Sequence, residues 1–225
     1  MIFGNKVLVI AAHPDDEVLG AGGTILKLIN ADVDVEVLIV TDGSSSQYQD
    51  DREILEKKHD ESARALKKLG VSRYFQWSFP DMRLDSVPHV ELNRELEKFI
   101  YSSGYDTVLC QDNGDVNMDH TCLFNSVRVA VRPHPKQNVK VFMTYYVNSS
   151  SEWGGIMSGS TFSPNIFVNI DDFIEDKLSS MAEYVTELRE YPHPRSLKSI
   201  KTSAEYFGNM VGHRNAEAFR LIYSR

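Results

Sequence analysis

Short apolar runs alternate along the chain with longer segments in which apolar residues recur every three or four positions. Short runs rich in β-branched residues are typical of buried strands, and the longer spacing is typical of amphipathic helices. Strands are therefore predicted at residues 6–12, 33–40, 73–77, 107–110 and 140–146. Helices are predicted between them at residues 19–29, 52–69, 90–102 and 121–131. Strands separated by such helices predict right-handed βαβ units, and hence an α/β fold: a Rossmann-like three-layer αβα sandwich with a mostly parallel sheet.

The pattern changes after the fifth predicted strand. Residues 147–165 are rich in Gly and Ser and too long for a plain connector, so we expect a loop over the functional site. Two further helices are predicted at residues 171–190 and 196–210. We expect residues 216–219 (Ala-Glu-Ala-Phe) to be structural and to pack the end of the chain onto the sheet. A chain of 225 residues can bury a full sheet between two helical layers, which predicts a single domain, 1–225.

A cluster of polar residues, His13, Asp15, Asp16 and Glu17, follows the first predicted strand, and Pro and Gly around it mark a sharp turn into a helix. The cluster therefore lies at the carboxyl end of a strand, the edge at which open α/β sheets bind ligands. Neighbouring side chains leave an extended backbone on opposite sides, so His13 and Asp16 can face a metal while Asp15 handles a proton. Asp15 could instead cap the following helix, and Glu17 is expected only to compensate the helix dipole.

Four short motifs extend this interpretation. The chain contains Ala-His-Pro-Asp-Asp-Glu at residues 12–17, Thr-Asp-Gly at 41–43, Asp119-His120 near the middle and Ala-Glu-Ala-Phe near the end. In this order they resemble the signature of the zinc-dependent N-acetylglucosaminyl deacetylases known as the PIG-L or LmbE-like family. The resemblance spans nearly the whole chain, and the first motif is highly specific. It implies removal of the N-acetyl group from a 2-acetamido sugar, either a small-molecule N-acetyl amino sugar or a glycoconjugate.

The resemblance implies that His13, Asp16 and His120 bind the metal. Two imidazoles and one carboxylate suit Zn²⁺ with one coordination position left open, although the same donor set also holds Fe²⁺ in oxygenases. The likeness to hydrolases favours zinc. Asp15 corresponds to the general base of the family, which deprotonates the attacking water and later protonates the leaving amine. A carboxylate beside a cation has a lowered pKa, so we expect Asp15 to be ionised.

Asp119 and Asn117 complete the predicted catalytic set. In the family, the carboxylate at the position of Asp119 supports a catalytic histidine two residues upstream, but this chain has Asn117 there. We therefore predict that Asn117, a neutral amide donor, helps to stabilise the oxyanion in place of an imidazolium. Asn117 could instead only shape the turn at residues 114–117, a role that Asn often fills.

Three further residues are predicted to contact the substrate: Asp42, His193 and Arg195. Asp42 could bond to backbone at the end of a strand or orient the histidine of the first motif. Arg195 lies in a His-Pro-Arg-Ser segment, residues 193–196, that resembles one branch of the family. It could bind an anionic group such as a phosphate or carboxylate, or be a surface residue at a helix start. Lys58 lies where relatives often have Arg, and we expect it to be solvated.

Composition and charge narrow the range of partners. The formal net charge is −8 at pH 7, and such an acidic chain is a poor partner for nucleic acid or anionic membranes. Cys110 and Cys122 are too far apart for a CxxC motif, and the N-terminal apolar run is too short for a membrane span or a signal peptide. We therefore expect a cytoplasmic protein with no membrane span, and homo-oligomers are left open. The alternative function is a catalytically silent sugar- or nucleotide-binding domain of the same fold.

Overall fold

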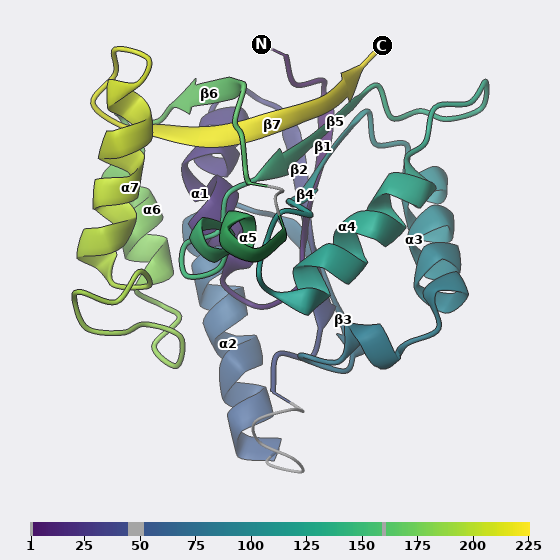
Figure 1. Ribbon diagram of the computed structural model, residues 1–225, viewed down its shortest axis with the longest axis horizontal. Coiled ribbons are helices and arrows are strands. Elements are labelled where there is room, and N and C mark those ends of the chain that lie inside the picture. Colours follow the sequence, from purple (N-terminus) through teal and green to yellow (C-terminus); the bar gives the residue numbers. More distant parts are fainter. Residues whose placement is uncertain (1, 45–51, 159–160) are drawn as a thin grey trace.

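The computed structural model describes residues 2–44, 52–158 and 161–225 (Figure 1). Within these residues, seven strands form one sheet in the order β3-β2-β1-β4-β5-β7-β6. The strands are β1 (Lys6–Ala11), β2 (Asp34–Thr41), β3 (Arg73–Phe79), β4 (Thr107–Gln111), β5 (Val141–Tyr145), β6 (Ile166–Asn169) and β7 (Ala216–Ser224). β1 to β5 run parallel to one another, whereas β7 runs antiparallel to both β5 and β6. The prediction of a mostly parallel sheet is confirmed.

Helices cover both faces of this sheet (Figure 1). They are α1 (Asp16–Ile29), α2 (Arg52–Lys68), α3 (His89–Ser103), α4 (Met118–Ala130), α5 (Ser151–Ser158), α6 (Ile174–Met181) and α7 (Leu197–Asn209), with a 3-10 turn at Leu84–Ser86. α1, α2, α6 and α7 pack on one face, and α3 and α4 pack on the other. The fold is therefore the predicted three-layer αβα sandwich. In the part of the chain that the structure describes, no helix has both the length and the apolar composition to cross a bilayer.

β1, in the middle of the sheet, shows why two helical layers form. Val7 and Val9 belong to the apolar core beneath α1 and α2, while Leu8 and Ile10 belong to the core beneath α3 and α4. None of the four is exposed to solvent. Because side chains alternate across a strand, a continuous apolar run produces a strand that must be covered on both faces.

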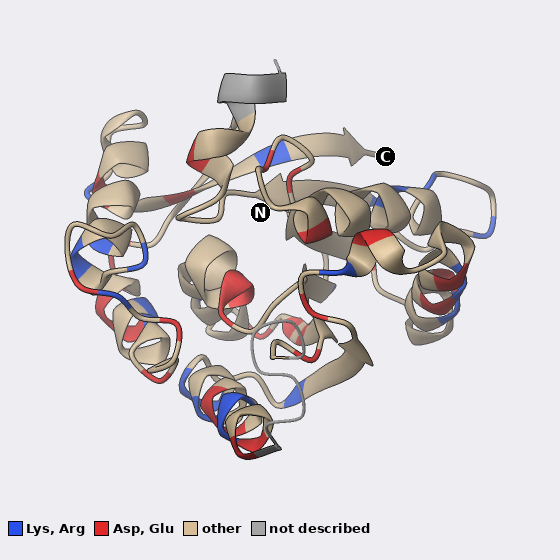
Figure 2. Ribbon diagram, turned by 60° about the horizontal axis from the view of Figure 1, so that its bottom comes forward, with Lys and Arg blue, Asp and Glu red and all other residues tan. Residues whose placement is uncertain are grey.

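The polar cluster of the sequence lies at the carboxyl end of β1. The chain order reverses between β1 and β4, because β1 pairs with β2 on one side and with β4 on the other. Ligands of open α/β sheets bind at such a switch point. The loops that follow β1 and β4 therefore bring His13 next to Asp119, although 106 residues separate them. Figure 2 turns this edge forward and shows Asp and Glu positions around its middle.

The second half of the chain differs from the prediction in two places. Residues 147–165, predicted as a loop, contain α5, while residues 159–160 lie outside the described part of the chain. The helix predicted at residues 171–190 is reduced to α6, and the chain after Met181 continues without regular helix. The apolar spacing does continue there, but the hydroxyl of Thr186 donates to the buried carboxylate of Glu61 at 2.6 Å. Hydrogen bonds of this kind, from a side chain to a distant partner, stabilise an irregular backbone in competition with a helix.

The end of the chain packs onto the sheet as predicted, and it does so as strand β7. Glu217 is buried there and accepts hydrogen bonds from Gly23 N at 2.8 Å, Thr24 N at 2.7 Å and Lys177 Nζ at 2.6 Å. Lys177 Nζ also donates to Leu19 O at 2.8 Å. The buried Lys177–Glu217 ion pair and its backbone hydrogen bonds therefore connect β7 with α1 and α6.

Candidate metal centre and catalytic pocket

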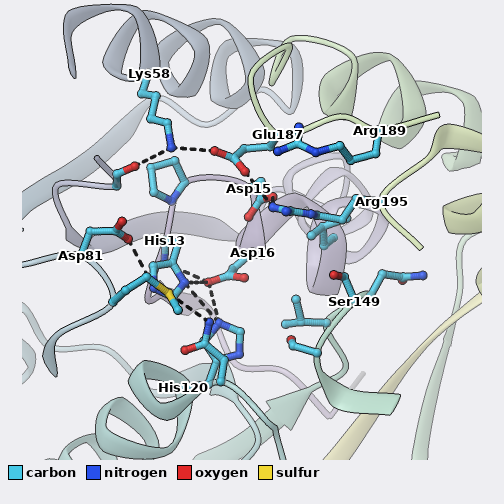
Figure 3. A pocket seen from close by; sticks show the side chains of 18 residues that line it. His13, Asp15, Asp16, Lys58, Asp81, His120, Ser149, Glu187, Arg189 and Arg195 are labelled. Atoms are coloured by element: carbon cyan, nitrogen blue, oxygen red, sulfur yellow. Dashed lines mark hydrogen bonds and ion pairs between the residues drawn. The ribbon is translucent and has the colours of Figure 1, made fainter. Parts of the chain in front are cut away.

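Three donor atoms converge at the switch point of the sheet (Figure 3). His13 Nδ1 lies 3.3 Å from Asp16 Oδ2, and His120 Nε2 lies 3.2 Å from the same oxygen and 3.3 Å from His13 Nδ1. Ligand atoms placed about 2.0 Å from a tetrahedral metal ion are about 3.3 Å apart, so these distances suit a tetrahedral site. The structure therefore brings together the three residues that were predicted as metal ligands.

Each histidine of this triangle has a carboxylate at its second nitrogen. Asp119 Oδ2 lies 3.1 Å from His13 Nε2, and Asp115 Oδ2 lies 3.0 Å from His120 Nδ1. A proton held on the outer nitrogen leaves the inner nitrogen free for a metal, as in many histidine sites. The donor set therefore fits a divalent ion.

Asp119 contacts the histidine of the first motif, His13, whereas the family pattern predicted that this carboxylate supports the residue at position 117.

Burial and neighbouring carboxylates set the charge of the two histidines. Burial lowers the pKa of His120, but Asp16 and Asp115 outweigh this effect and raise the pKa to about 9. For His13, burial again lowers the pKa, and contacts with Asp119 and Asp16 raise it well above its ordinary value. A metal binds only unprotonated nitrogens, so metal binding must release these protons and weakens as the pH falls.

Asp15 lies beside the triangle with a carboxylate oxygen, Oδ2, that has no hydrogen-bond partner among the residues that the structure describes. Its backbone φ of 108° lies in the left-handed region, which is strained for a residue other than Gly and occurs often at active sites. The buried side chain makes no capping hydrogen bond, which argues against a helix cap. It lines the pocket, as the three residues of the triangle do.

The net effect of burial and the protein side chains is to raise the pKa of Asp15, whereas the lowered pKa expected from the sequence depends on a cation bound beside it. Burial raises this pKa well above its ordinary value, and the charges of Asp16 and Glu187 raise it further. Arg195 acts in the opposite direction. The expected ionised state of Asp15 would therefore depend on Arg195 and on a cation at the triangle.

Glu17, expected only to compensate the helix dipole, is fully buried and makes specific contacts. Its Oε1 accepts a hydrogen bond from the hydroxyl of Tyr184 at 2.5 Å, and its Oε2 accepts one from Asp15 N at 3.3 Å. Burial raises the pKa of Glu17 to about 7, although the hydrogen bond from Tyr184 lowers it. Glu17 thus connects the strained backbone of Asp15 to the segment after α6.

A chain of charged side chains lines the pocket opposite the triangle (Figure 3). Lys58 Nζ donates to Gly43 O at 2.5 Å and to Glu187 Oε1 at 2.7 Å. Arg195 Nη1 donates to Glu187 Oε2 at 2.7 Å and lies 3.5 Å from Asp15 Oδ2. The expectation of a solvated Lys58 is wrong: the residue is 7% exposed, because Glu187 and a backbone carbonyl compensate its charge. Arg195 lines the pocket and is paired with protein carboxylates.

Asn117 lies at the pocket wall and also caps the start of α4. Its Oδ1 accepts a hydrogen bond from the backbone N–H of Asp119 at 2.9 Å. Its Nδ2 lies 3.6 Å from Met82 Sδ, and Met82 lines the same pocket. Asn117 therefore shapes the local backbone, one of its two predicted roles, while its amide N–H₂ group contacts Met82 beside the pocket and leaves the other role a prediction.

Asp42 and His193 bond to nearby backbone. Asp42 Oδ1 accepts a hydrogen bond from Ser44 N at 3.0 Å, and His193 Nδ1 accepts one from Arg195 N at 3.1 Å. Neither residue is among the described residues that line the pocket, whereas Arg195 is. Of the three residues predicted to contact substrate, the structure places only Arg195 at this pocket.

Four residues of the site were missed in the sequence: Asp81, Gln111, Asp115 and Glu187. Gln111 Nε2 donates to Asp16 Oδ2 at 2.8 Å, and Asp81 Oδ1 lies 3.6 Å from His13 Nε2. Gln111 and Asp115 lie at or just after the end of β4, so the rule that placed the first cluster could have found them. Asp81 and Glu187 lie in irregular segments without a sequence pattern that would mark them.

The fold and the site together define a class of protein: an α/β protein whose His and Asp side chains at the switch point of the sheet could hold a metal ion. Residues 8–131 match the family described as PIG-L: GlcNAc-PI de-N-acetylase, and the chain belongs to this family. The family identified from the motifs is therefore confirmed, and so is the predicted enzyme type, an N-deacetylase that hydrolyses amide bonds.

Curated relatives agree with this assignment, and solved structures share the fold. The chain is 30% identical to the diacetylchitobiose deacetylase of Thermococcus kodakarensis, over 96% of the chain and 83% of that protein. It is 25% identical to the uncharacterized deacetylase YaiS of Escherichia coli, over 79% of the chain and 89% of that protein. The structure of N,N'-diacetylchitobiose deacetylase from Pyrococcus horikoshii superposes with a TM-score of 0.80 at 24% identity, covering 97% of this chain and 84% of that one. The conserved protein TT1542 from Thermus thermophilus gives 0.78 at 24% identity, covering 97% and 95%.

Proposed function

We propose that this chain is a zinc-dependent hydrolase that removes the N-acetyl group from a 2-acetamido sugar or its conjugate. The observation that carries the proposal is one pocket that is lined both by the His13–Asp16–His120 triangle and by Asp15, whose Oδ2 has no hydrogen-bond partner among the described residues. Two imidazole nitrogens and a carboxylate oxygen at tetrahedral spacing suit Zn²⁺, with Fe²⁺ as the alternative metal. The relative from Thermococcus kodakarensis, a diacetylchitobiose deacetylase, supports the same substrate class.

The side chains divide the hydrolysis between them. A bound metal would act as a Lewis acid toward the acetamide carbonyl. Asp15 accepts a proton from the attacking water and returns it to the leaving nitrogen, so the products are acetate and the free amine of the sugar. Arg195 favours the ionised form of Asp15 before this transfer, since its Nη1 lies 3.5 Å from Asp15 Oδ2.

Two further residues act near the carbonyl. Asn117 offers a neutral N–H donor to the oxyanion that forms as water attacks. Asp119 keeps the His13 ring oriented through the contact of 3.1 Å at its outer nitrogen. Asn117 is thus proposed to contact the reacting atoms, whereas Asp119 acts through His13.

The size and lining of the pocket favour a single polar ring. Its volume is about 210 Å³, which is below the usual range for drug-sized ligands. Side chains that can bond to sugar hydroxyls line it, among them Asp81, Asn148, Ser149 and Arg189. Asp42 and His193 would meet only a substrate that extends beyond this pocket. Cytoplasmic location, formation of homo-oligomers and the lack of a nucleic-acid partner stay predictions.

Metal content and amine release test the proposal together. Protein purified without chelator should contain about one zinc per chain and should release amine from N-acetylglucosamine or its simple glycosides. His120→Ala should lose most of the metal. Asp15→Asn should keep the metal while turnover falls about a hundredfold to ten-thousandfold, the usual contribution of a general base.

The control is Asp85→Asn, which changes an exposed carboxylate in the 3-10 turn and should alter neither metal content nor turnover. Zinc binding without amine release from any N-acetyl sugar would contradict the proposed substrate class. Binding of a sugar or nucleotide without metal or turnover would support the silent binding domain. If Asp15→Asn loses metal and rate together, Asp15 is a ligand and not the base.

A further inference from the structure

A second cavity, which we call the aromatic groove, lies next to the catalytic pocket. Its volume is about 460 Å³. The large side chains that line it are those of Tyr146, Phe162, Pro164, Tyr206, Phe207 and Met210. Its wall is mostly aromatic and apolar, whereas charged and amide side chains dominate the catalytic pocket.

Helix α7 forms one wall of the groove. Tyr206 and Met210 lie four residues apart and therefore on one side of the helix, with Phe207 beside them. Tyr206 is 62% exposed and Met210 is 55% exposed, so this side presents neighbouring large apolar side chains to solvent. The opposite wall contains Tyr146 and Phe162, whose rings lie 5.7 Å apart, and the Tyr146 ring lies 5.3 Å from that of Phe207.

The groove and the catalytic pocket share a wall. In the segment after β5, Tyr146 lines the groove, and the next two residues, Val147 and Asn148, line the catalytic pocket. Asn148 Nδ2 donates a hydrogen bond to Ser203 Oγ at 2.8 Å, and Ser203 lines the groove. A small cavity between the two is lined by both Asn148 and Ser203. The two sites are therefore adjacent, and a substrate that occupies both must pass over this shared wall.

The distance between the two sites suits a substituted sugar. Arg195 lies at the pocket just before α7 begins at Leu197, and Tyr206 lies in the last turn of the same helix. With a rise of about 1.5 Å per residue, the nine residue steps from Leu197 to Tyr206 span about 13 to 14 Å along the helix axis. A ligand that fills both sites needs a polar ring at one end and an apolar group within that distance.

We propose that the aromatic groove binds the apolar aglycone of a 2-acetamido glycoside whose sugar ring occupies the catalytic pocket. This inference rests on the proposed function and names its substrate class more closely. Apolar groups gain by leaving water for such a wall. A second sugar would bury hydroxyl groups against a mostly apolar wall, where the described hydroxyl partners are those of Tyr146, Thr202, Ser203 and Tyr206 and that of Tyr146 already donates to Glu152, which is less favourable than burying an apolar group.

Another copy of this chain is a weaker occupant. A stable interface buries about 800 Å² on each partner, whereas the groove is a concave site of a few side chains, and of its large apolar members among the described residues only Tyr206 and Met210 are more than half exposed. The direct link through Asn148 to the catalytic pocket has no role in self-association, but it is what a substrate requires.

Glycosides of N-acetylglucosamine that differ only in the aglycone test the proposal. We expect kcat/KM of wild-type protein for the hexyl β-glycoside to exceed that for the methyl β-glycoside by at least about tenfold, mainly through KM, because only the longer aglycone can reach the groove and bury apolar surface. The double variant Tyr206→Ser/Met210→Ser should lose this preference and keep the rate on the methyl glycoside. Tyr101→Ser, at a similarly exposed tyrosine on α3, should change neither.

Titration calorimetry with the same methyl and hexyl glycosides separates this proposal from the proposed function. If no glycoside releases amine, but the hexyl glycoside binds more tightly than the methyl one and only the double variant removes the difference, the proposed function fails and the groove remains an apolar-aglycone site. Equal kcat/KM and equal affinity for methyl and hexyl glycosides in wild type would overturn the groove proposal. Self-association that the double variant abolishes, with the hexyl preference unchanged, would overturn it in favour of a second copy.

Discussion

Asp15 and Arg195 form an ion pair that is not closed by a short hydrogen bond: Oδ2 of Asp15 lies 3.5 Å from Nη1 of Arg195. The same Nη1 donates to Glu187 Oε2 at 2.7 Å, so Glu187 holds the guanidinium back from Asp15. Lys58 holds Glu187 from the other side at 2.7 Å. Asp15 Oδ2 therefore has no hydrogen-bond partner in the described part of the chain while a positive charge stays near.

Arg195→Gln should lower turnover about tenfold to a hundredfold at neutral pH with unchanged metal content. Arg195 opposes the burial that raises the pKa of Asp15, so its loss raises this pKa further and leaves less of the ionised base. The variant should regain rate as the pH rises, and this is measured as kcat against pH at equal metal occupancy. The turnover of Arg195→Lys should fall between that of wild type and that of Arg195→Gln.

The control for Arg195 is Arg64→Gln. Arg64 lies on α2 and forms an exposed ion pair with Glu183, so its replacement should leave kcat unchanged. An Arg195→Gln variant with wild-type kcat and a raised KM would assign Arg195 to substrate binding alone, the other role that its sequence context left open.

Asn117 carries a structural and a proposed catalytic role on different atoms, so substitutions can separate them. Asn117→Asp keeps a side-chain oxygen to cap α4 but replaces the amide donor with a negative charge. Its stability should stay near that of wild type, while turnover falls about a hundredfold or more, the usual cost of losing an oxyanion donor. Asn117→Ala should lose both the rate and about 1 kcal/mol of unfolding free energy.

These effects are measured as turnover at equal zinc occupancy and by urea unfolding. An Asn117→Asp variant as active as wild type would leave Asn117 with the cap alone. Asn117→His should be the mildest substitution for turnover and should add an ionisation to the pH–rate profile above about pH 6.

The sequence predicted those parts of the molecule whose signals are local. The apolar run before His13 has the composition of a strand buried on both faces, and the sharp turn after it places His13 and Asp16 at the sheet edge. The ligand His120 came from the resemblance between motifs. The structure adds the reason that it is close: β4 lies beside β1, so the loop after β4 meets the loop after β1.

The contacts of Glu187 could not be predicted in this way. This residue lies in a stretch whose apolar spacing predicted a helix, and its partner Lys58 is 129 residues away in the sequence. A buried ion pair between two irregularly spaced positions leaves no periodic pattern. The direction of β7 could not be predicted for a related reason. The apolar residues at 216–219 indicate that this segment is buried, but they do not indicate which strands it pairs with.

Lys177 and Glu217 make a buried ion pair whose loss should destabilise the fold and not the chemistry. Lys177→Met leaves the Glu217 carboxylate buried with only two backbone N–H partners, so unfolding should become easier by about 3 to 5 kcal/mol. Urea unfolding measures the change, and zinc content per folded molecule should not alter. The control is Lys201→Met, since the Lys201–Glu175 pair is exposed and its loss should have no measurable effect. Equal stability of wild type and Lys177→Met would show that the pair is replaceable.

Glu17 should make the free energy of unfolding fall as the pH rises from about 4.5 to about 7. The ordinary pKa of its side chain is 4.5, and burial raises it to about 7 in the folded protein. Below pH 4.5 both states carry the proton. Between the two values the unfolded chain ionises while the folded protein does not, so stability is lost across this window. The loss is complete above about pH 7 and amounts to about 3 kcal/mol.

Glu17→Gln tests this dependence, because an amide does not ionise at either pH. Urea unfolding at pH 4.5 and pH 8 in the presence of chelator should show a drop for wild type that is about 3 kcal/mol larger than the drop for the variant. Tyr184→Phe removes the hydrogen bond that lowers the pKa of Glu17, so this pKa should rise further. The pH-dependent fall in the unfolding free energy of this variant should therefore extend to higher pH. Parallel stability curves for wild type and Glu17→Gln would mean that Glu17 is ionised in the folded protein, held by Tyr184 and by the backbone N–H of Asp15.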